Sequence, residues 1–259
     1  MPSTYAHYRF ASEMIPSLPE TVQQTVRRFR RLYDAGSHGP DLFFYHNPFS
    51  RTSTAERGYR LHRQQGSRFF AQAARNLKLR PSEGGNAYLF GVLTHFALDS
   101  LCHPLIRRWD AEKMVSHCGA ESEFDRFLLE ADGKIPPQEQ DLSRHMELTK
   151  EDVDTICRFY PYVDARDIRV SLRNMRLCTK ALGIPGKRKR WLLRKGMEAA
   201  GVADMLIPDA PDAGSRERDL LLMEQYRLAA ERFPEMESQL MECLEHNTPL
   251  GGSFDLIFG

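Results

Sequence analysis

The stretch from residue 86 to residue 103 constrains the fold more than any other part of the sequence. It reads Asn-Ala-Tyr-Leu-Phe-Gly-Val-Leu-Thr-His-Phe-Ala-Leu-Asp-Ser-Leu-Cys-His. We expect a helix that ends before Pro104, because proline disfavours helical geometry in the residue that precedes it. His95, Asp99 and His103 are four residues apart, so they share one stripe about 80° wide. Most other positions are apolar, which predicts a helix buried inside the protein.

A buried stripe of two imidazoles and a carboxylate indicates a metal site. Unpartnered polar groups are costly to bury, and a divalent cation such as zinc is a common partner of histidine and aspartate. His117 and Glu121 form a second pair at helical spacing. Each pair alone occurs often by chance, but the two in tandem favour a metal site. They supply more ligands than the four or so that one zinc takes, so two or three ions are expected.

His7, Asp41 and His62 add three candidate ligands upstream. Taken alone, each histidine is also compatible with a surface position, and Asp41 with a turn that follows Pro40. His62 lies four residues from a glycine on either side, which is understandable if another group approaches closely there. Three further histidines are expected in loops or at the surface rather than as ligands: His38, His46 and His145.

The rest of the sequence predicts an all-α fold, because no segment shows the alternation of a strand over a useful length. A capping box is expected at Ser53 with Glu56, and Thr149 with Asp152 is expected to begin a helix. We expect residues 1–135 to form a metal-site half and residues 136–259 a helical half packed on it in one continuous domain. The predicted helices cover residues 19–33, 53–79, 117–131, 149–160, 164–182, 187–200, and 216–232 with 234–246 as a pair hinged at Pro234.

Composition narrows the class of protein. The net charge is +1, so charge balance does not predict a stable nucleic-acid complex. The five cysteines form no CxxC motif, and we expect free thiols in a reducing compartment. The N-terminal residues do not resemble a signal peptide, and no uninterrupted apolar stretch reaches 18 residues, the length expected of a membrane span. A cytoplasmic location is therefore expected.

The ordered ligand set resembles the zinc-dependent phospholipase C family, which shares its fold and trinuclear zinc site with single-strand-specific zinc nucleases. The resemblance rests on residues 87–99, on His103, and on His117-Cys-Gly-Ala-Glu121, and it covers about residues 1–135. Family members have a His-x-x-x-Asp helix, a following histidine and a downstream His-x-x-x-Glu. A histidine, an aspartate and another histidine come earlier in the family, and these places are filled here by His7, Asp41 and His62.

The resemblance implies an all-α bundle with the metal site between core helices, and a ligand set for two or three zinc ions. One zinc is expected to take Asp41, His62, His95 and Asp99. Asp99 is expected to bridge to a second zinc that also takes His7. The third is expected to take His103, His117 and Glu121. In secreted members the mature N-terminus also ligates zinc; here only six residues precede His7, and whether this end reaches the metal stays open.

The resemblance also implies a reaction, the hydrolysis of phosphate esters by zinc-activated water. Asp41 is the candidate general base. A phosphoester substrate is expected, including phospholipid, with at most peripheral contact with a membrane. Two alternatives stay open: a zinc nuclease or nucleotidase, and a non-catalytic helical protein that binds zinc. The sequence does not indicate an oligomeric state.

One dense basic segment runs from Gly186 to Lys195 and reads Gly-Lys-Arg-Lys-Arg-Trp-Leu-Leu-Arg-Lys. Charge runs usually lie on a solvated face, in which case Trp191 and Leu192 would pack inward. The other interpretation is a patch that attracts anionic lipid or a phosphate-bearing substrate.

Overall fold

The protein is all-helical, as a computed structural model shows. Its described ranges contain α-helices, short 3-10 helices and one isolated bridge between Gln65 and Ile257, with no strand among them. The prediction of an all-α fold is confirmed. The structure describes residues 4–47, 50, 52–183 and 186–259.

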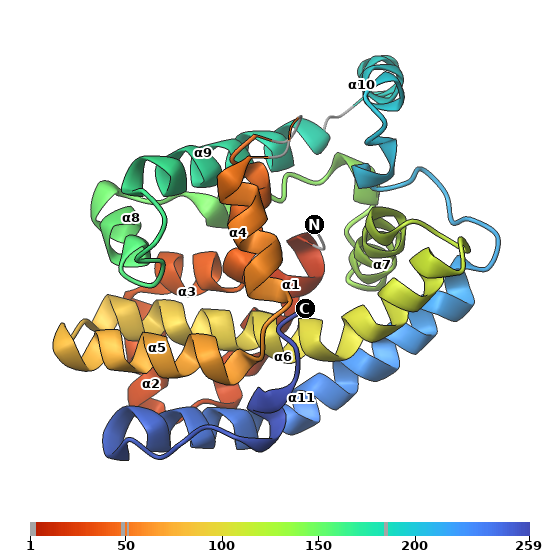
Figure 1. Ribbon diagram of the computed structural model, residues 1–259. Helices are drawn as coiled ribbons and strands as arrows, with labels where there is room; N and C mark the ends of the chain where they lie inside the picture. The colour runs from red at the N-terminus through yellow and green to blue at the C-terminus, as the bar shows by residue number, and fades with distance from the viewer. Residues whose placement is uncertain (1–3, 48–49, 51, 184–185) are drawn as a thin grey trace.

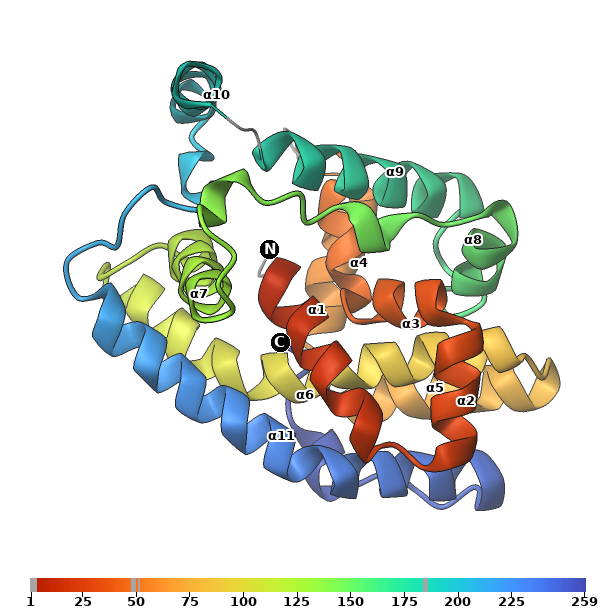
Figure 2. The same cartoon turned by 180° about the vertical axis from the view of Figure 1, so that it is seen from behind.

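Helix α6 is the centre around which the other elements pack (Figure 1). It contacts α3, α11, α1, α2, α5 and α7. Helix α5 lies in front of it in Figure 1, and α1 and α2 lie in front of it when the molecule is seen from behind (Figure 2). The α-helices are α1 (Thr4–Met14), α2 (Glu20–Arg28), α3 (Arg30–Gly36), α4 (Ser53–His62), α5 (Gly66–Leu79), α6 (Glu83–Ala111), α7 (His117–Ala131), α8 (Lys150–Cys157), α9 (Ala165–Leu182), α10 (Lys187–Ala199) and α11 (Ser215–His246). The 3-10 helices used below are η2 (Gly39–Tyr45), η5 (Ala203–Met205) and η6 (Gly252–Asp255).

The expectation that this central helix ends before Pro104 is wrong, because α6 continues to Ala111. Pro104 cannot donate the i→i−4 hydrogen bond, a loss of about 3 kcal/mol in a helix interior. Beyond it, however, Ile106 and Trp109 are buried in the core, and burying such a side chain contributes about 1.5–3 kcal/mol. Packing therefore offsets the proline, and His103 and Arg107 lie one helical turn apart on a continuous helix.

Length and hydropathy alone would allow α6 to span a membrane. The search of the sequence for a membrane span did not identify α6, because polar residues interrupt its apolar stretch. In the structure 83% of the most apolar window of α6 is buried inside the protein. Its apolar composition is therefore explained by its position in the core.

Three other predicted helices differ from the structure. The predicted helix 53–79 is two helices, α4 and α5, and Thr52 rather than Ser53 caps the first by accepting a hydrogen bond from the Ala55 amide. The predicted helix 19–33 is interrupted at Phe29. The predicted pair hinged at Pro234 is one helix, α11, which bends along its length in Figure 1, since an internal proline removes a backbone hydrogen bond.

Other boundaries agree with the sequence. The helix expected to begin at Thr149 is α8, and Thr149 and Asp152 form a capping box there, with both hydrogen bonds present. Helices α9 and α10 begin and end within a residue of the predicted limits. One hydrophobic core joins both halves of the chain, from Phe10 through Phe96 to Phe233 and Phe258. Whether residues 1–135 and 136–259 act as two halves of one domain stays a prediction.

Two glycines allow α3 and α6 to pack with their backbones in contact. A Cβ atom on Gly91 would lie 2.1 Å from the Tyr33 carbonyl oxygen, and one on Gly36 would lie 2.3 Å from the Tyr88 carbonyl oxygen. Both neighbours are main-chain atoms, so they cannot rotate away. The short distance between α3 and α6 depends on glycine at these two positions. Because η2 directly follows α3, this packing also determines where η2 lies.

We expect Gly91→Ala to lower the free energy of unfolding by about 1–3 kcal/mol or more, because an overpacked core must shift. The matched control is Gly196→Ala in α10, where a Cβ would meet nothing within 4 Å. That change should raise stability by about 0.5–1 kcal/mol, since glycine weakens a helix interior. Urea unfolding of both variants would measure this, and equal effects would contradict the close packing described here.

Candidate metal centre

All eight candidate ligands come together at the middle of α6. Within the described ranges, three groups have ligand atoms within 4.8 Å of one another. The first is His7, His95 and Asp99; the second is Asp41, His62 and His95; the third is His103, His117 and Glu121. His7 comes from α1, Asp41 from η2, His62 from the end of α4, and the third group from α6 and α7. His117 is half-buried and the other seven are buried.

The carboxylate of Asp99 is the common element of this cluster. Its Oδ1 lies 3.1 Å from His7 Nε2 and 3.5 Å from His103 Nε2. Its Oδ2 lies 3.1 Å from His95 Nε2 and 4.0 Å from His62 Nε2. One aspartate thus faces four imidazoles, and its two oxygens point toward different pairs of them.

Two further carboxylates complete the arrangement on either side of Asp99. Asp41 Oδ1 lies 3.0 Å from His62 Nε2. Glu121 Oε1 lies 3.4 Å from both His103 Nε2 and His117 Nε2. His117 and Glu121 lie one turn apart on α7, as their spacing predicts.

The geometry of the cluster fits zinc. Tetrahedral zinc with bonds of about 2.0–2.1 Å places neighbouring ligand atoms roughly 3.3 Å apart, close to the 3.0–3.5 Å separations seen here. His95 is fully buried, and neither of its ring nitrogens has a hydrogen-bond partner within the described chain. A small cavity of ≈ 20 Å³ is lined by His7, Asp99 and Glu121, among others. It has room for about one water-sized particle.

The charges of the cluster favour a cation. Burial by itself would raise the pKa of Asp99, but His103, His95 and His7 outweigh it and hold that pKa well below its usual value. Asp41 is similar: burial opposes ionisation, and the hydrogen bond from His62 lowers the pKa overall. Both carboxylates are therefore ionised at neutral pH, the form that binds a metal.

Local structure fixes the orientation of several ligands. The backbone amides of Tyr5 and Ala6 donate to the Asp125 carboxylate of α7 at 2.9 and 2.8 Å. This caps the start of α1, where an anion is stabilised by the helix dipole, and places His7 in the cluster. The carbonyl oxygen of Gly58 lies 2.8 Å from His62 Nδ1, which directs Nε2 toward the cluster.

Gly39 allows η2 to approach α6. Its φ is +46°, and a Cβ there would lie 2.5 Å from His95 Cδ2. Only glycine accepts both the left-handed backbone and the close ring. Two residues later Asp41 reaches the cluster. The close approach expected at the glycines on either side of His62 is confirmed. A Cβ on Gly58 would lie 3.1 Å from Phe43 and Phe44, and one on Gly66 would lie 2.4 Å from the Phe96 ring. Gly66, however, begins α5 rather than continuing the helix of His62.

Sequence reasoning missed the contribution of Gly259. Its amide donates to the His62 carbonyl oxygen at 3.1 Å, and a Cβ on it would lie 2.8 Å from Asp99 Oδ2. Arg107 Nη1 donates to a main-chain oxygen of Gly259 at 2.9 Å. The spacing of Arg107, one turn beyond His103, was a usable signal. Nothing in the sequence indicated that residue 259 folds back onto Asp99.

The expected roles of the remaining histidines are partly confirmed. His38 lies in a turn and belongs to none of the ligand groups among the described residues. His145 is not a free surface residue as expected: its Nε2 lies 2.7 Å from His38 Nε2, and its ring stacks on Tyr8 with centroids 4.1 Å apart. Burial lowers the pKa of His145 to about 3 and also lowers that of His38, so both imidazoles are neutral and one Nε2–H donates to the other Nε2.

The ligand cluster opens into a cleft of ≈ 650 Å³. Asp41, His62, His103 and His117 line its floor, and Gly259 lies beside them. The other side chains include the aromatic rings of Phe44 and Tyr59 and the guanidinium groups of Arg63 and Arg107. A catalytic zinc site keeps an open position, whereas a structural one is closed. The cleft therefore has the access that a catalytic site needs.

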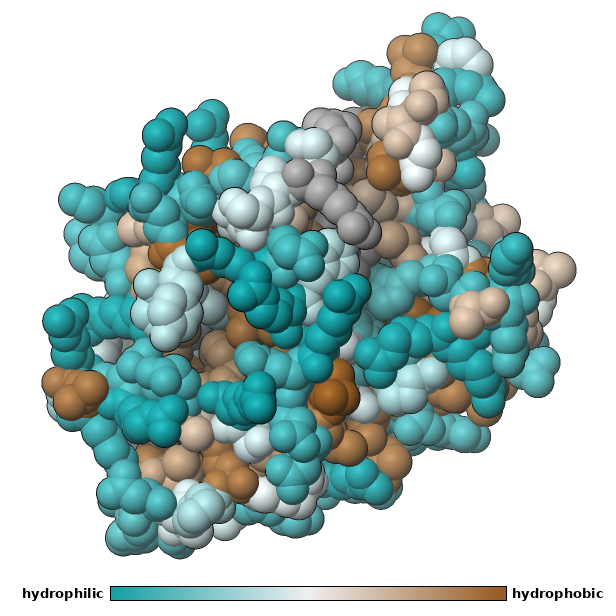
Figure 3. Space-filling model, in the orientation of Figure 1, coloured by the Kyte–Doolittle hydropathy of each residue, from teal (hydrophilic) through white to brown (hydrophobic). Residues whose placement is uncertain are grey.

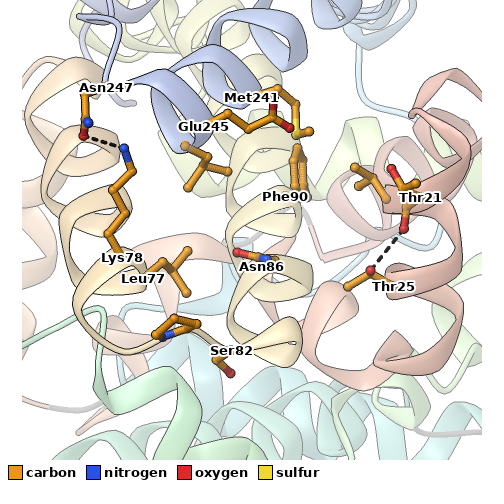
Figure 4. A pocket seen from close by; sticks show the side chains of 13 residues that line it. Thr21, Thr25, Leu77, Lys78, Ser82, Asn86, Phe90, Met241, Glu245 and Asn247 are labelled. Atoms are coloured by element: carbon orange, nitrogen blue, oxygen red, sulfur yellow. Dashed lines mark hydrogen bonds between the residues drawn. The ribbon is translucent and has the colours of Figure 1, made fainter.

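A slightly larger cavity of ≈ 710 Å³ lies elsewhere, between α2, α5, α6 and α11. Figure 4 shows Leu77, Phe90 and Met241 along its wall and a hydrogen bond between Lys78 and Asn247 at one end. None of the eight candidate ligands lines it. It has no cluster of ligand side chains, so we assign it no catalytic role.

Two expectations concern groups outside the cluster. The possible contribution of the N-terminus falls on residues 1–3, which lie outside the described residues. The five cysteines form no disulfide in the described chain, as expected, and none belongs to a ligand group there.

Comparison with known protein families identifies the family of this chain. The model of one protein family, described as zinc dependent phospholipase C, matches residues 6–166. That range contains all eight candidate ligands and exceeds half of the chain. No curated protein and no solved structure matches significantly.

We expect Gly259→Ala to displace the residues that cover Asp99 and to lower the stability of metal-free protein by about 1 kcal/mol, the value of the lost hydrogen bond to His62. The control is Gly251→Ala, whose Cβ would meet its nearest atom at 4.0 Å. Thermal unfolding after treatment with a chelator would compare them. If both variants unfold at the same temperature as the wild type, Gly259 does not contribute to the site.

Proposed function

We propose, from the premise that this chain belongs to the zinc-dependent phospholipase C family, that it hydrolyses phosphate esters at the cleft above Asp99. The family is one of phosphoesterases. The observation that most supports the proposal is the Asp99 carboxylate, buried and ionised among four imidazoles. Burying a charged carboxylate costs far more free energy than side-chain packing can offset, so a binding role is indicated.

Three zinc ions match the three ligand groups best. Asp41, His62, His95 and Asp99 would hold the first. Asp99 would also contribute to the second with His7, because its two oxygens face different imidazoles. The third would take His103, His117 and Glu121, which form a separate group nearer the α7 side.

Zinc bound here would lower the pKa of water and polarise the phosphoryl group. The protein's own groups account for the rest of the reaction. Asp41 lines the cleft, is ionised and is held by His62, so it is placed to accept a proton from the attacking water. Arg63 and Arg107 bring positive charge to the same cleft, where they would attract and orient the phosphate.

The substrate class that we propose is a phospholipid or a related phosphodiester. The family supports this, and so does a cleft that combines two guanidinium groups with the apolar faces of Phe44 and Tyr59. A zinc nuclease or nucleotidase is the alternative, in which these rings would stack on a base. A cytoplasmic location remains part of the proposal, supported by five cysteines that form no disulfide in the described chain, as is usual in a reducing compartment.

Zinc content tests the ligand assignment. Wild-type protein should bind about three ions, His117→Ala about two and Asp99→Asn about one, since Asp99 serves two of the proposed sites. His246→Ala is the control, because His246 is exposed at the end of α11 and should leave the content unchanged. Elemental analysis after dialysis against buffered zinc would measure it.

The ligand assignment would be wrong if wild-type protein held only traces of zinc. It would also be wrong if Asp99→Asn kept the full zinc content.

Substrate hydrolysis tests the reaction. We expect the wild type to cleave short-chain phospholipid and to release its phosphorylated headgroup. Asp41→Asn should lower kcat by about 10²–10⁴-fold, the usual contribution of a general base. The control is Asp255→Asn, which makes the same chemical change at an exposed position on η6 and should keep full activity.

The same assay with single-stranded DNA and nucleoside monophosphates separates the alternatives. If either of these substrates is cleaved faster than the phospholipid, the nuclease or nucleotidase alternative is favoured. Full zinc content with no hydrolysis of any phosphoester would favour a non-catalytic protein.

A further inference from the structure

Helix α10 stands away from the rest of the molecule in both views (Figures 1 and 2). It contains six basic residues and one acidic residue, Glu198. Among the described parts of the chain, its only packing partner of note is the short helix η5. A charged helix in this position needs an explanation, because it adds little to the hydrophobic core.

The inward side of α10 is attached through arginine. Arg190 is 5% exposed and donates to Asp209 Oδ1 at 2.5 Å and to the Gln138 carbonyl oxygen at 3.2 Å. Arg194, one turn later, donates to Asp209 Oδ2 at 2.8 Å. These bonds fix which side of the helix faces the protein, and they engage two of its six positive charges.

The outward side combines apolar and basic side chains. Trp191 is 59% exposed and Leu192 is 63% exposed, so the interpretation in which they pack inward is wrong. At 100° per residue, Arg188 and Lys195 lie between Trp191 and Leu192 on the side turned away from Arg190. Lys187 is exposed and lies at the edge of this side, next to Trp191. Figure 3 shows hydrophobic surface beside hydrophilic surface on this projecting helix. Solvation of the charges alone does not explain why Trp191 is exposed on this face instead of packing inward.

The basic charges of this face are largely uncompensated. No ion pair involves Lys187, Arg188 or Lys189 within the described ranges, and Lys195 pairs only with Glu198, also exposed. Tryptophan and leucine next to lysine and arginine suit a membrane surface, where the ring enters the interface and the cations meet lipid phosphates. We propose that the outward face of α10, formed by Arg188, Trp191, Leu192 and Lys195 with Lys187 at its edge, docks this protein onto an anionic phospholipid surface.

The place of α10 in the fold connects this surface to the cleft. The chain leaves α10 at Ala199 and soon reaches Val202 and Met205, which line the cleft above the metal cluster. Docking through α10 would therefore bring the mouth of the cleft close to lipid headgroups. This consequence rests on the proposed phospholipase function, whereas docking itself does not.

Vesicle binding tests the docking surface. Wild-type protein should sediment with vesicles of phosphatidylcholine mixed with phosphatidylglycerol and not with phosphatidylcholine alone. Lys187→Gln, Arg188→Gln and Lys195→Gln combined should weaken binding about a hundredfold, since each basic side chain near an anionic surface contributes roughly fivefold. The control removes the same charge from exposed positions on α11, with Arg216→Gln, Arg227→Gln and Arg232→Gln, and should bind like the wild type.

Tryptophan fluorescence gives a second readout. The chain has two tryptophans, and Trp109 is buried at 2% exposure while Trp191 is not. Emission should shift to shorter wavelength when anionic vesicles are added, because Trp191 leaves water. Trp191→Phe should abolish the shift, whereas Trp109 continues to report that the core is folded.

The proposal is overturned if the wild type does not bind anionic vesicles, if it binds zwitterionic vesicles equally well, or if both triple variants lose binding alike. It is also overturned if short duplex DNA binds through α10 and vesicles do not, which would indicate a nucleic-acid surface.

A water-soluble chromogenic phosphodiester separates this proposal from the proposed function. The α10 variant should hydrolyse it at the wild-type rate and lose activity only on vesicles. If the wild type hydrolyses neither substrate, the proposed function fails, and the vesicle-binding result still decides the role of α10.

Discussion

The burial of one carboxylate, Asp99, imposes the strongest requirement on this structure. An ionised group with 3% exposure can be kept in the core only if opposite charge or metal surrounds it. The fold meets this requirement by bringing histidines from α1, α4 and α6 within 4.0 Å of its oxygens. Much of the topology can be understood as the placement of those helices around the middle of α6.

Close backbone packing is what makes this placement possible. Gly36 and Gly91 let α3 lie against α6, and Gly39 then lets η2 pass beside the His95 ring. Asp41 reaches the cluster of candidate ligands because of these contacts, although nothing in its own surroundings in the sequence marks it as a candidate. On the other side of α6, Asp125 of α7 holds the start of α1 and so positions His7. Glycines and caps, rather than the ligands themselves, determine the distances in the site.

The two proposals assign separate roles to the cleft and to α10. The cleft combines the ligand cluster with Arg63 and Arg107, groups that interact with a single phosphate at short range. Helix α10 presents its charges outward on a face that also exposes Trp191 and Leu192, an arrangement suited to an extended anionic surface. Helix η5 packs against α10 and its Met205 lines the cleft. A protein docked on a membrane through α10 would therefore bring its cleft close to the substrate.

The sequence by itself determined the all-α class, the buried polar stripe of α6, the His117–Glu121 pair and, through family resemblance, the eight residues that the structure brings together. The class, the stripe and the pair follow from helical periodicity, which is a local property, whereas the full set of eight followed only from the resemblance. Only the tertiary structure decided that α6 continues through Pro104, that α4 and α5 are separate, that His145 pairs with His38, and that Gly259 covers Asp99. Each of these depends on contacts between residues far apart in the chain, whose packing energy outweighs local preference and leaves no periodic pattern in the sequence.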